Sequence, residues 1–574
     1  MMTNGTGALI VGAGPTGLTL ACELARRGAP FRIVSAADGP STKVKASELQ
    51  SRTLEVFEDM GLRERAEELG VRLYGLTMYA EGQRVLHMAY DDLDAPFPYK
   101  LVCGQVHTER LLGELLASLG GGVEWGSRVE AVDAYGDGAV ATVRGPRGVD
   151  QIGADWVIGC DGAHSTVREV TGATLEGKTY PEEWILGDVK IDWDMTPDEQ
   201  YGFLSGRRNG LTELTCQPLP HNRWQVGGPL PIEPGAPSRN GEQPTLAELQ
   251  DFFDRNSAVP ARLSEPTWLT IYRVHQRRVT RRVHGRLILA GDAAHLSSPV
   301  GGVGMNTGIQ DAYNLGWKLA LVLAGAADPQ LIESYNFERE AVVRNLFSVS
   351  NRQHLMSSLR HPVAKELRNH LLSVLTNFDS VTDRIYRDQS QTTWGYRGSP
   401  IVGEESGAPL PRAGLSDHGS QLAAWTSFAR GPRAGDRAPD ALEIRDSDGN
   451  ARRLFEVLAG AEHVLLYFLG CEQPHAETLA TASAIARRIR EVNIAPLDPH
   501  LVVPAERAPA GLDWDGPMIF DPSQALHNRY GARGECLVLI RPDGYIGFRA
   551  QPPSLQALLR HLHGIFTAAA RQPA

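Results

Sequence analysis

The residues best suited to chemistry lie between positions 291 and 319, where the sequence reads GDAAHLSSPVGGVGMNTGIQDAYNLGWKL. Asp292 follows an apolar run and can accept hydrogen bonds from a polyol chain. A glycine-rich loop comes next, and apolar spacing from Ile309 to Leu323 predicts a long helix after the loop. The start of such a helix presents unpaired N–H groups and a partial positive charge. This segment therefore suits one end of a large nucleotide cofactor.

A second glycine-rich turn, near the N-terminus, predicts a nucleotide-binding βαβ unit. An apolar run at 8–11 ends at Gly12, a helical pattern follows, and a second apolar run covers 31–34. In this G-x-G-x-x-G pattern, Gly12 permits a tight turn, Gly14 lets the backbone approach a pyrophosphate, and Gly17 allows close helix–strand packing. The N-terminus of the helix attracts the phosphates. The two glycine-rich segments together indicate one cofactor held at both ends.

The second strand of this unit ends without the acidic residue that usually binds the adenosine ribose. Ser35 stands at that position, and Asp38 is the nearest carboxylate. We expect the ribose contact to come from the Ser35 hydroxyl, from water or from Asp38.

A third candidate segment is Asp161–Gly162, which follows an apolar run at 156–160. Ser165 or Thr166 can cap a short helix after it. Taken alone, this segment is more typical of an ordinary turn than of a binding site. His295 has no second histidine, cysteine or carboxylate at ligand spacing, so we interpret it as a structural residue and predict no metal site.

Composition disfavours several classes of function. The chain has 574 residues and a formal net charge of −11, which argues against nucleic acid and anionic membranes as partners. No run of about 18 apolar residues predicts a membrane span, and no basic leader precedes the first strand, so we expect a cytoplasmic protein. The six cysteines are scattered without a C-x-x-C pair, which is typical of reduced thiols.

Together these segments resemble the single-component aromatic hydroxylases of the para-hydroxybenzoate hydroxylase type, the class A flavoprotein monooxygenases. The run from Lys45 to Glu55 is similar to the family's R-A-x-x-x-x-x-R-T-L-E helix, with Lys45 replacing the usual phosphate-facing arginine and Arg52 matching the second arginine. Gln105 is similar to the family's flavin-contacting glutamine at the start of a helix. The resemblance covers residues 5–345.

The resemblance implies FAD as the cofactor, with NADPH or NADH and O₂ as co-substrates. In the family, NAD(P)H reduces the flavin, and a flavin C4a-hydroperoxide delivers oxygen to a carbon ortho or para to a phenol. We assign no catalytic side chain, because the chemistry belongs to the flavin. The cofactor-binding residues implied in this way are Gly12, Gly14, Pro15, Gly17, Ser35, Lys45, Arg52, Gln105, Asp161, Gly162, Asp292, Pro299, Gly301, Gly302, Gly304, Met305 and Asn306.

We predict an α/β chain whose first two parts hold the cofactor and the substrate. A Rossmann-like FAD-binding domain of the para-hydroxybenzoate hydroxylase type covers residues 1–180 and 275–396. An antiparallel-sheet substrate domain covers 181–274 together with part of 72–104. Residues 397–440 are rich in glycine and proline, which predicts a linker.

The C-terminal third, residues 441–574, resembles the thioredoxin-like extension of phenol hydroxylase and its polyketide-hydroxylase relatives. Cys471 follows the first predicted strand of this domain, and no second cysteine lies close to it in the sequence. Because disulfide exchange needs a resolving thiol, we interpret the domain as structural or dimer-forming, which is compatible with a homodimer.

The extension favours a phenolic substrate of polycyclic or polyketide type, as in antibiotic biosynthesis. Arg273, His275 and Arg277 are the most polar cluster of the substrate domain, and they fit a phenol-binding pocket and a solvated strand face equally well. Two alternatives stay open: a Baeyer–Villiger oxygenase on the same scaffold and a non-catalytic flavin-binding protein. A flavin-dependent halogenase is disfavoured because its W-x-W-x-I-P motif is missing.

Overall fold

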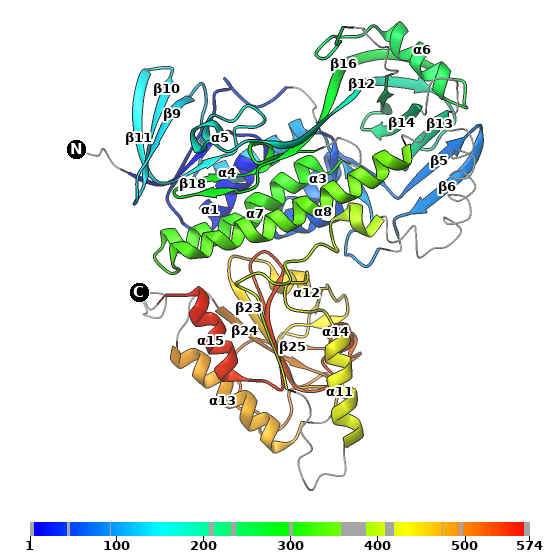
Figure 1. Cartoon of the computed structure of the whole chain (residues 1–574). Coiled ribbons are helices and arrows are strands. Elements are labelled where there is room, and N and C mark those ends of the chain that lie inside the picture. Colours follow the sequence, from blue (N-terminus) through cyan, green and yellow to red (C-terminus); the bar gives the residue numbers. More distant parts are fainter. Residues whose placement is uncertain are drawn as a thin grey trace.

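The computed structural model describes residues 5–42, 46–91, 93–205, 212–230, 237–297, 302–357, 386–407, 418–472, 474–492 and 497–567. Figure 1 shows a larger part, which runs from the N-terminus to α8, and a C-terminal domain that lies below α7 and α8 in this view. The end of the chain returns to the larger part, where the Thr567 N–H donates to the Ala326 carbonyl over 2.8 Å. The fold is mixed α/β with several sheets.

The first sheet builds the nucleotide-binding unit that the sequence predicts. β1 (Thr6–Val11) pairs in parallel with β2 (Phe31–Val34) and β11 (Gly148–Gly159), and β11 pairs in parallel with β18 (Leu287–Leu289). Alternate residues of β1 pack into two different cores, which explains its continuous apolar run. The other strands of this sheet are β8 (Val123–Glu124), β9 (Arg128–Ala134), β10 (Ala139–Gly145) and β17 (Val283–His284).

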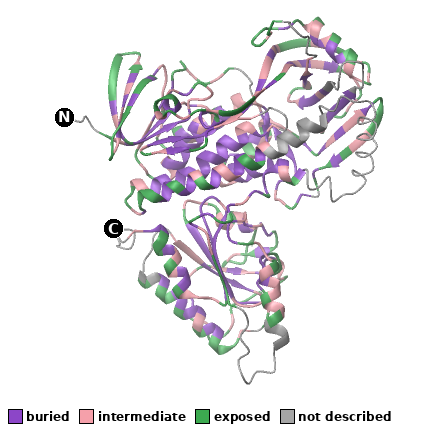
Figure 2. Cartoon of the chain, in the orientation of Figure 1, coloured by how far each residue is buried: buried purple, intermediate pink, exposed green. Residues whose placement is uncertain are grey.

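Three helices bring the glycine-rich segments onto this sheet. α1 (Pro15–Arg26) begins directly after Gly14 and packs against both α4 (Gln105–Ser118) and α7 (Gly304–Leu323). Figure 2 shows that α7 is buried along most of its length. The other helices of this part are α2 (Ser51–Asp59), α3 (Arg63–Leu69), α5 (Thr166–Thr171), α8 (Glu333–Ser357) and the 3₁₀ turns η1 (Gly291–Ala293) and η2 (Pro329–Ile332).

The second sheet is almost entirely antiparallel and includes most of the region 181–274. Its order is β19-β16-β12-β15-β14-β13-β5-β6, so two strands from the 72–104 region extend it. α6 (Leu246–Asn256) packs on one face through a core that contains Leu249 and Phe253. The strands are β5 (Gly75–Ala80), β6 (Gln83–Ala89), β12 (Glu176–Asp192), β13 (Glu199–Ser205), β14 (Thr212–Leu219), β15 (Arg223–Pro229), β16 (Arg262–Arg278) and β19 (His295–Leu296).

A small three-stranded sheet lies between the first sheet and the second sheet, near the start of α7. β3 (Glu48–Leu49) and β4 (Val71–Leu73) both pair antiparallel with β7 (Lys100–Val102). Asn306, at the start of α7, donates to the Glu48 carbonyl of β3, and Lys100 of β7 lies 3.7 Å from the Glu48 carboxylate.

The C-terminal domain is an eight-stranded sheet with helices on both faces (Figure 1). One of its two cores includes Trp317 and Leu321 of α7, so the domain is packed onto the helix that leads from the glycine-rich loop. Its elements are β20 (Gly403–Ser406), α11 (His418–Arg430), β21 (Ile444–Arg445), β22 (Ala451–Arg452), α12 (Leu454–Leu458), β23 (His463–Phe468), α13 (Ala476–Val492), β24 (Leu497–Val503), β25 (Met518–Phe520), α14 (Ala525–Tyr530), β26 (Cys536–Ile540), β27 (Ile546–Gln551) and α15 (Leu555–Ile565).

Residues 397–440 differ from the linker that their composition predicts. β20 pairs in parallel with β27, and Phe428 of α11 lies in a core of the C-terminal domain. Glycine and proline are frequent in this segment, yet Ile401 and Phe428 are buried in the cores of the C-terminal domain, whereas Leu422 and Trp425 are exposed. In the described ranges, no helix is long and apolar enough to cross a membrane, and no cluster of side chains could hold a metal ion.

Candidate cofactor and active site

The N-terminal glycine turn has the geometry that its spacing predicts. Gly12 has φ +104°, and a Cβ there would overlap the carbonyl of Cys160, the residue directly after β11. A Cβ on Gly17 would overlap the Gly12 carbonyl. In contrast, a Cβ on Gly14 would meet nothing within 4 Å, although Gly14 directly precedes α1. Of these three glycines, Gly14 is therefore the one that faces open space. This space lies at a helix N-terminus, which suits a phosphate.

The two glycine-rich segments meet at one side chain of α1. A Cβ on Gly291, which has φ +59°, or on Gly308 of α7 would overlap the Thr16 hydroxyl. Glycine at both positions lets α1, η1 and the first turns of α7 approach each other closely. The structure thus brings together two segments that are far apart in the sequence.

The loop before α7 is tied to the small sheet by Asn306. Its side-chain amide donates to the Glu48 carbonyl over 2.8 Å and to the Gly302 carbonyl over 2.6 Å, and its oxygen accepts from the Gln50 N–H over 2.8 Å. Gly304 is the first residue of α7, and Met305 packs partly buried against the first core. Of the other predicted cofactor residues, Lys45, Pro299 and Gly301 lie outside the described residues.

Asp161 combines a structural role with a spare acceptor. Its Oδ2 accepts from the backbone N–H groups of Thr166 (2.8 Å) and Val167 (3.4 Å) at the start of α5, and Ser165 caps that helix. Its Oδ1 is buried and has no hydrogen-bond partner in the described part of the chain. Burial raises the pKa of Asp161, although hydrogen bonds from Ser165 and the backbone oppose this shift. An unpartnered carboxylate oxygen here fits a hydroxyl donor from a ligand.

Arg168 fixes the Asp161–Gly162 turn against the η1 segment. It donates to the Ala293 carbonyl over 3.2 Å and to the Ala163 carbonyl over 2.8 Å. Asp292, beside Ala293, is exposed. Asp161 and Asp292 are consequently held on neighbouring segments, which suits binding of a polyol chain between them.

Gln105 and Ser35 lie at the edges of the same region. The Gln105 N–H donates to the Ala46 carbonyl over 2.8 Å, and its side chain donates to Glu109 over 2.7 Å. Ser35 is buried, and its hydroxyl accepts from the Ala37 N–H over 3.3 Å.

Arg52 lies elsewhere than its predicted role requires. Its guanidinium is buried and binds Glu55 and the Asp543 carbonyl of the C-terminal domain, each over 2.5 Å. Glu55 also pairs with Arg437 over 2.8 Å. Arg52 therefore links two domains and is not available to a phosphate, which the sequence motif alone could not reveal.

His295 belongs to a buried polar network beneath the loop, consistent with a structural role. Its Nε2 lies 2.9 Å from Asp311 Oδ2, and Arg339 donates to Asp311 Oδ1 over 2.6 Å. Burial opposes ionisation of Asp311, but Arg339 and His295 hold its pKa well below its ordinary value. Arg339 also donates to the Thr307 carbonyl over 3.1 Å. The network supports the first turn of α7, and sequence reasoning missed Asp311 and Arg339.

Arg273 and His275 are both on β16, but they contact different partners on the neighbouring strand β12. Arg273 pairs with Glu183 over 2.9 Å at a partly exposed edge, and His275 lies 2.9 Å from the Thr179 hydroxyl. Arg277 also donates to that hydroxyl, over 2.8 Å. Burial and the charges of Arg277 and Arg273 lower the pKa of His275. His275 and Arg277 therefore share one threonine, whereas Arg273 is bound to a carboxylate.

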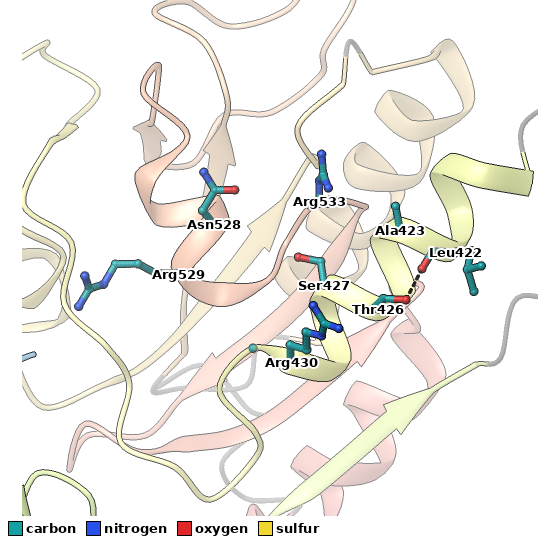
Figure 3. A pocket seen from close by; sticks show the side chains of 9 residues that line it. Leu422, Ala423, Thr426, Ser427, Arg430, Asn528, Arg529 and Arg533 are labelled. Atoms are coloured by element: carbon teal, nitrogen blue, oxygen red, sulfur yellow. Dashed lines mark hydrogen bonds between the residues drawn. The ribbon is translucent and has the colours of Figure 1, made fainter. Parts of the chain in front are cut away.

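A separate hollow of about 540 Å³ lies on the C-terminal domain, between α11 on one side and α14 with the segment after it on the other (Figure 3). It contains none of the predicted site residues. Its lining is basic and polar, and Figure 3 shows that Arg529 points away from Arg430 and Arg533. The residues that line it are Leu422, Ala423, Thr426, Ser427, Arg430, Gly431, Asn528, Arg529 and Arg533. Because it is open and shares no residue with the glycine-rich segments, we place no cofactor there.

The residues present fit a bound FAD. The open space at Gly14, the unpartnered Asp161 oxygen and the N-terminus of α7 lie on segments that pack together around Thr16. A dinucleotide needs contacts for its phosphates, its hydroxyl groups and its ring. The open space at Gly14 suits the phosphates, the Asp161 oxygen suits a hydroxyl group, and the N-terminus of α7 suits the ring.

Known proteins are similar over nearly the whole chain. A family described as "FAD binding domain" matches residues 5–350, and one described as "Aromatic-ring hydroxylase, C-terminal" matches residues 431–569. A 6-methylpretetramide 4-monooxygenase from Streptomyces rimosus is 34% identical, with 98% of this chain and 94% of the relative covered. A pentachlorophenol 4-monooxygenase from Sphingobium chlorophenolicum is 31% identical, with 94% and 93% covered.

A solved structure gives the same match at the level of the fold. The anhydrotetracycline hydroxylase from Streptomyces rimosus superposes with a TM-score of 0.70 at 27% identity, and the match covers all of both chains. The similarity therefore includes the C-terminal domain as well as the two glycine-rich segments.

Proposed function

This chain belongs to the FAD-dependent aromatic-ring monooxygenases, and from that premise we propose that it hydroxylates a phenolic, polycyclic substrate of polyketide type with NAD(P)H and O₂. The observation that carries the proposal is the meeting of the two glycine-rich segments at Thr16, beside the open space at Gly14. The substrate class is supported by the relatives named for pretetramide and anhydrotetracycline, which match from end to end.

The residues of this chain have distinct roles in holding the cofactor. Gly14 and the N-terminus of α1 would bind the pyrophosphate, and Ser35 the adenosine ribose. Asp161 and Asp292 would accept hydrogen bonds from the ribityl chain. Gly302, Gly304 and Asn306 would hold the ring at the N-terminus of α7, where the helix dipole favours negative charge. When bound, FAD supplies the redox chemistry and the oxygen transfer.

The second sheet covers the place where an aromatic substrate would lie. The Gln217 side chain of β14 donates to the Ser47 hydroxyl over 3.3 Å, so this sheet meets the small sheet beside the cofactor loop. A sheet in this position would help to exclude water from the ring and so protect a reactive oxygen donor from wasteful decay. Arg273, His275 and Arg277 are assigned no step, because their side chains are bound to Glu183 and Thr179 of the neighbouring strand β12.

We also propose that the C-terminal domain has a thioredoxin-like core without redox chemistry. Strand order β24-β23-β26-β27, with β23 and β24 parallel, supports this proposal, as does α13 between them. Cys471 and Cys536 are both free. The homodimer and the cytoplasmic location stay predictions from the sequence.

The function is tested by purifying the holoenzyme and following NAD(P)H consumption with a panel of phenols and naphthols under O₂, with mass detection of products. We expect a flavin absorption band, substrate-stimulated NAD(P)H consumption and products that gain one oxygen as a hydroxyl group. A ring-expanded lactone would support a Baeyer–Villiger oxygenase instead. A protein that binds FAD but oxidises NAD(P)H at the same slow rate with every substrate would overturn the proposal.

A further inference from the structure

Glu48 lies where the small sheet meets the loop that begins α7. Its carbonyl accepts from the Asn306 side chain over 2.8 Å, so its backbone position is fixed by the first turn of α7. Its side chain is buried, and a Cβ on Gly302 would overlap the Glu48 carboxylate. A carboxylate is therefore in direct contact with the loop assigned to the flavin ring.

The charge of Glu48 is only partly compensated. Lys100 Nζ lies 3.7 Å from Glu48 Oε2, and Gln50 donates to the same oxygen over 3.1 Å. Lys100 is 2% exposed, and its ammonium lies 5.3 Å from the centre of the Tyr90 ring. Burial raises the pKa of Tyr90 well above its ordinary value, so this neighbour is neutral. The charged groups that face the loop from β3 and β7 are thus one carboxylate and one ammonium.

Such a pair acts on any ligand whose charge changes at the loop. Oxidised flavin accepts two electrons from NAD(P)H. The reduced flavin is negatively charged when it takes up only one proton with these two electrons. The helix dipole of α7 favours that charge, whereas Glu48 opposes it and is nearer to Gly302 than its partner is. Two unit charges about 8 Å apart interact by about 2 kcal/mol at an effective dielectric constant of about 20.

We infer that Glu48 sets the reduction potential of the bound flavin: its carboxylate disfavours the reduced cofactor at the Gly302 loop, and Lys100 offsets this effect. The inference rests on the proposed placement of FAD between Gly302 and Asn306. Glu48 is a positioning and charge-tuning residue for the cofactor, and it takes no proton or electron itself.

The test measures the midpoint potential of the holoenzyme by equilibration with a reference dye, without substrate. Glu48→Gln keeps the shape and removes the negative charge, so reduced FAD should bind at least about tenfold more tightly relative to oxidised FAD, a rise of about 30 mV. Lys100→Met should shift the potential in the opposite direction. The double variant Glu48→Gln with Lys100→Met should lie between the two single variants.

A matched control is Glu404→Gln, which removes a carboxylate paired with Arg549 over 2.7 Å in the C-terminal domain. Its potential should equal that of the wild type. A purely structural role for Glu48 would weaken oxidised and reduced FAD equally and leave the potential unchanged. That result, or shifts of the same sign in both single variants, would overturn the inference.

Failure of the proposed function would look different. It would appear as a normal wild-type potential together with no hydroxylated product from any phenol. If Glu48→Gln does not fold, Lys100→Met and the double variant still decide the sign of the effect.

Discussion

The two ends of α7 are built by different means. At its N-terminus, the contacts with neighbouring segments are made mainly by glycine backbone, by Asn306 and by Thr16, and the buried Asp311–Arg339 pair supports the first turn from below. Farther along, Asn314 and Lys318 bind Glu338 of α8 over 2.8 and 2.6 Å. The first end leaves room for a ligand, whereas the second is closed by side chains of the same chain.

The closed end is also where the C-terminal domain docks. Arg541 donates to both oxygens of Glu338 over 2.6 and 3.0 Å, and Asp543 accepts from Asn314 over 3.0 Å. Burial opposes ionisation of Glu338, but Arg541 and Lys318 hold its pKa well below its ordinary value. From this difference between the ends, we expect substitutions at the cofactor end to cost less stability than substitutions at the docking end.

The largest effect is expected at Glu338. Glu338→Ala removes the one carboxylate that both Arg541 and Lys318 bind, and leaves their charges buried. The free energy of unfolding should fall by about 3–5 kcal/mol, measured by urea denaturation. As a control, Glu491→Ala removes an exposed carboxylate that pairs with Arg488 over 2.8 Å on α13, and it should cost about 0–1 kcal/mol. Equal losses of unfolding free energy in the two variants would show that the buried cluster of Glu338, Arg541 and Lys318 contributes no more to stability than a surface ion pair.

A pH series tests the same end through Lys318. Burial lowers the pKa of Lys318 to about 8 from the usual 10.5, although Glu338 beside it favours the charged form. Between these values the unfolded chain binds more protons than the folded chain, so stability should rise with pH in this window. Below pH 8 Lys318 is protonated in both states, so stability no longer depends on its titration, and the destabilising effect of burying its charge is at its maximum.

The corresponding measurement compares the unfolding free energy of wild type and Lys318→Met from pH 7.5 to about 10. The difference should change by on the order of 3 kcal/mol or less, in favour of the wild type at high pH. Parallel curves would contradict a depressed pKa at this site.

A smaller effect is expected at the cofactor end, at Gly17. Because a Cβ there would overlap the Gly12 carbonyl, Gly17→Ala should lower stability by about 1–3 kcal/mol and weaken FAD binding. Gly113→Ala in α4, where a Cβ would meet nothing within 4 Å, is the matched control and should be neutral or slightly stabilising. Thermal unfolding of the apoprotein measures the loss of stability, and the further rise in unfolding temperature with FAD measures the loss of FAD binding.

Sequence reasoning captured the features that depend on backbone geometry. The turn at Gly12, the close packing at Gly17 and the cap at Ser165 follow from local spacing, and the structure confirms them. The family and the mixed α/β fold also follow, because several motifs occur in one order.

Features that depend on long-range partners could not be predicted. Arg52 sits in a motif associated with phosphate, but Glu55 and the 541–545 turn take its guanidinium. Glu338 and Arg541 are far apart in the sequence, and the local pattern around each residue does not indicate the other as its partner. The strand β20 could not be predicted from the sequence, because a short strand in a glycine-rich segment forms only when the edge of a sheet is present to pair with it.

The most direct test of the account is the FAD dissociation constant of Gly14→Ala, measured by titrating the apoprotein. Gly14 has φ −77°, and a Cβ there would meet no atom of the chain, so the unfolding free energy of the apoprotein should be unchanged. FAD should nevertheless bind at least about tenfold more weakly, a loss of about 1.4 kcal/mol, because the methyl group fills space meant for the pyrophosphate. A dissociation constant equal to that of the wild type would contradict the placement of the cofactor at the two glycine-rich segments.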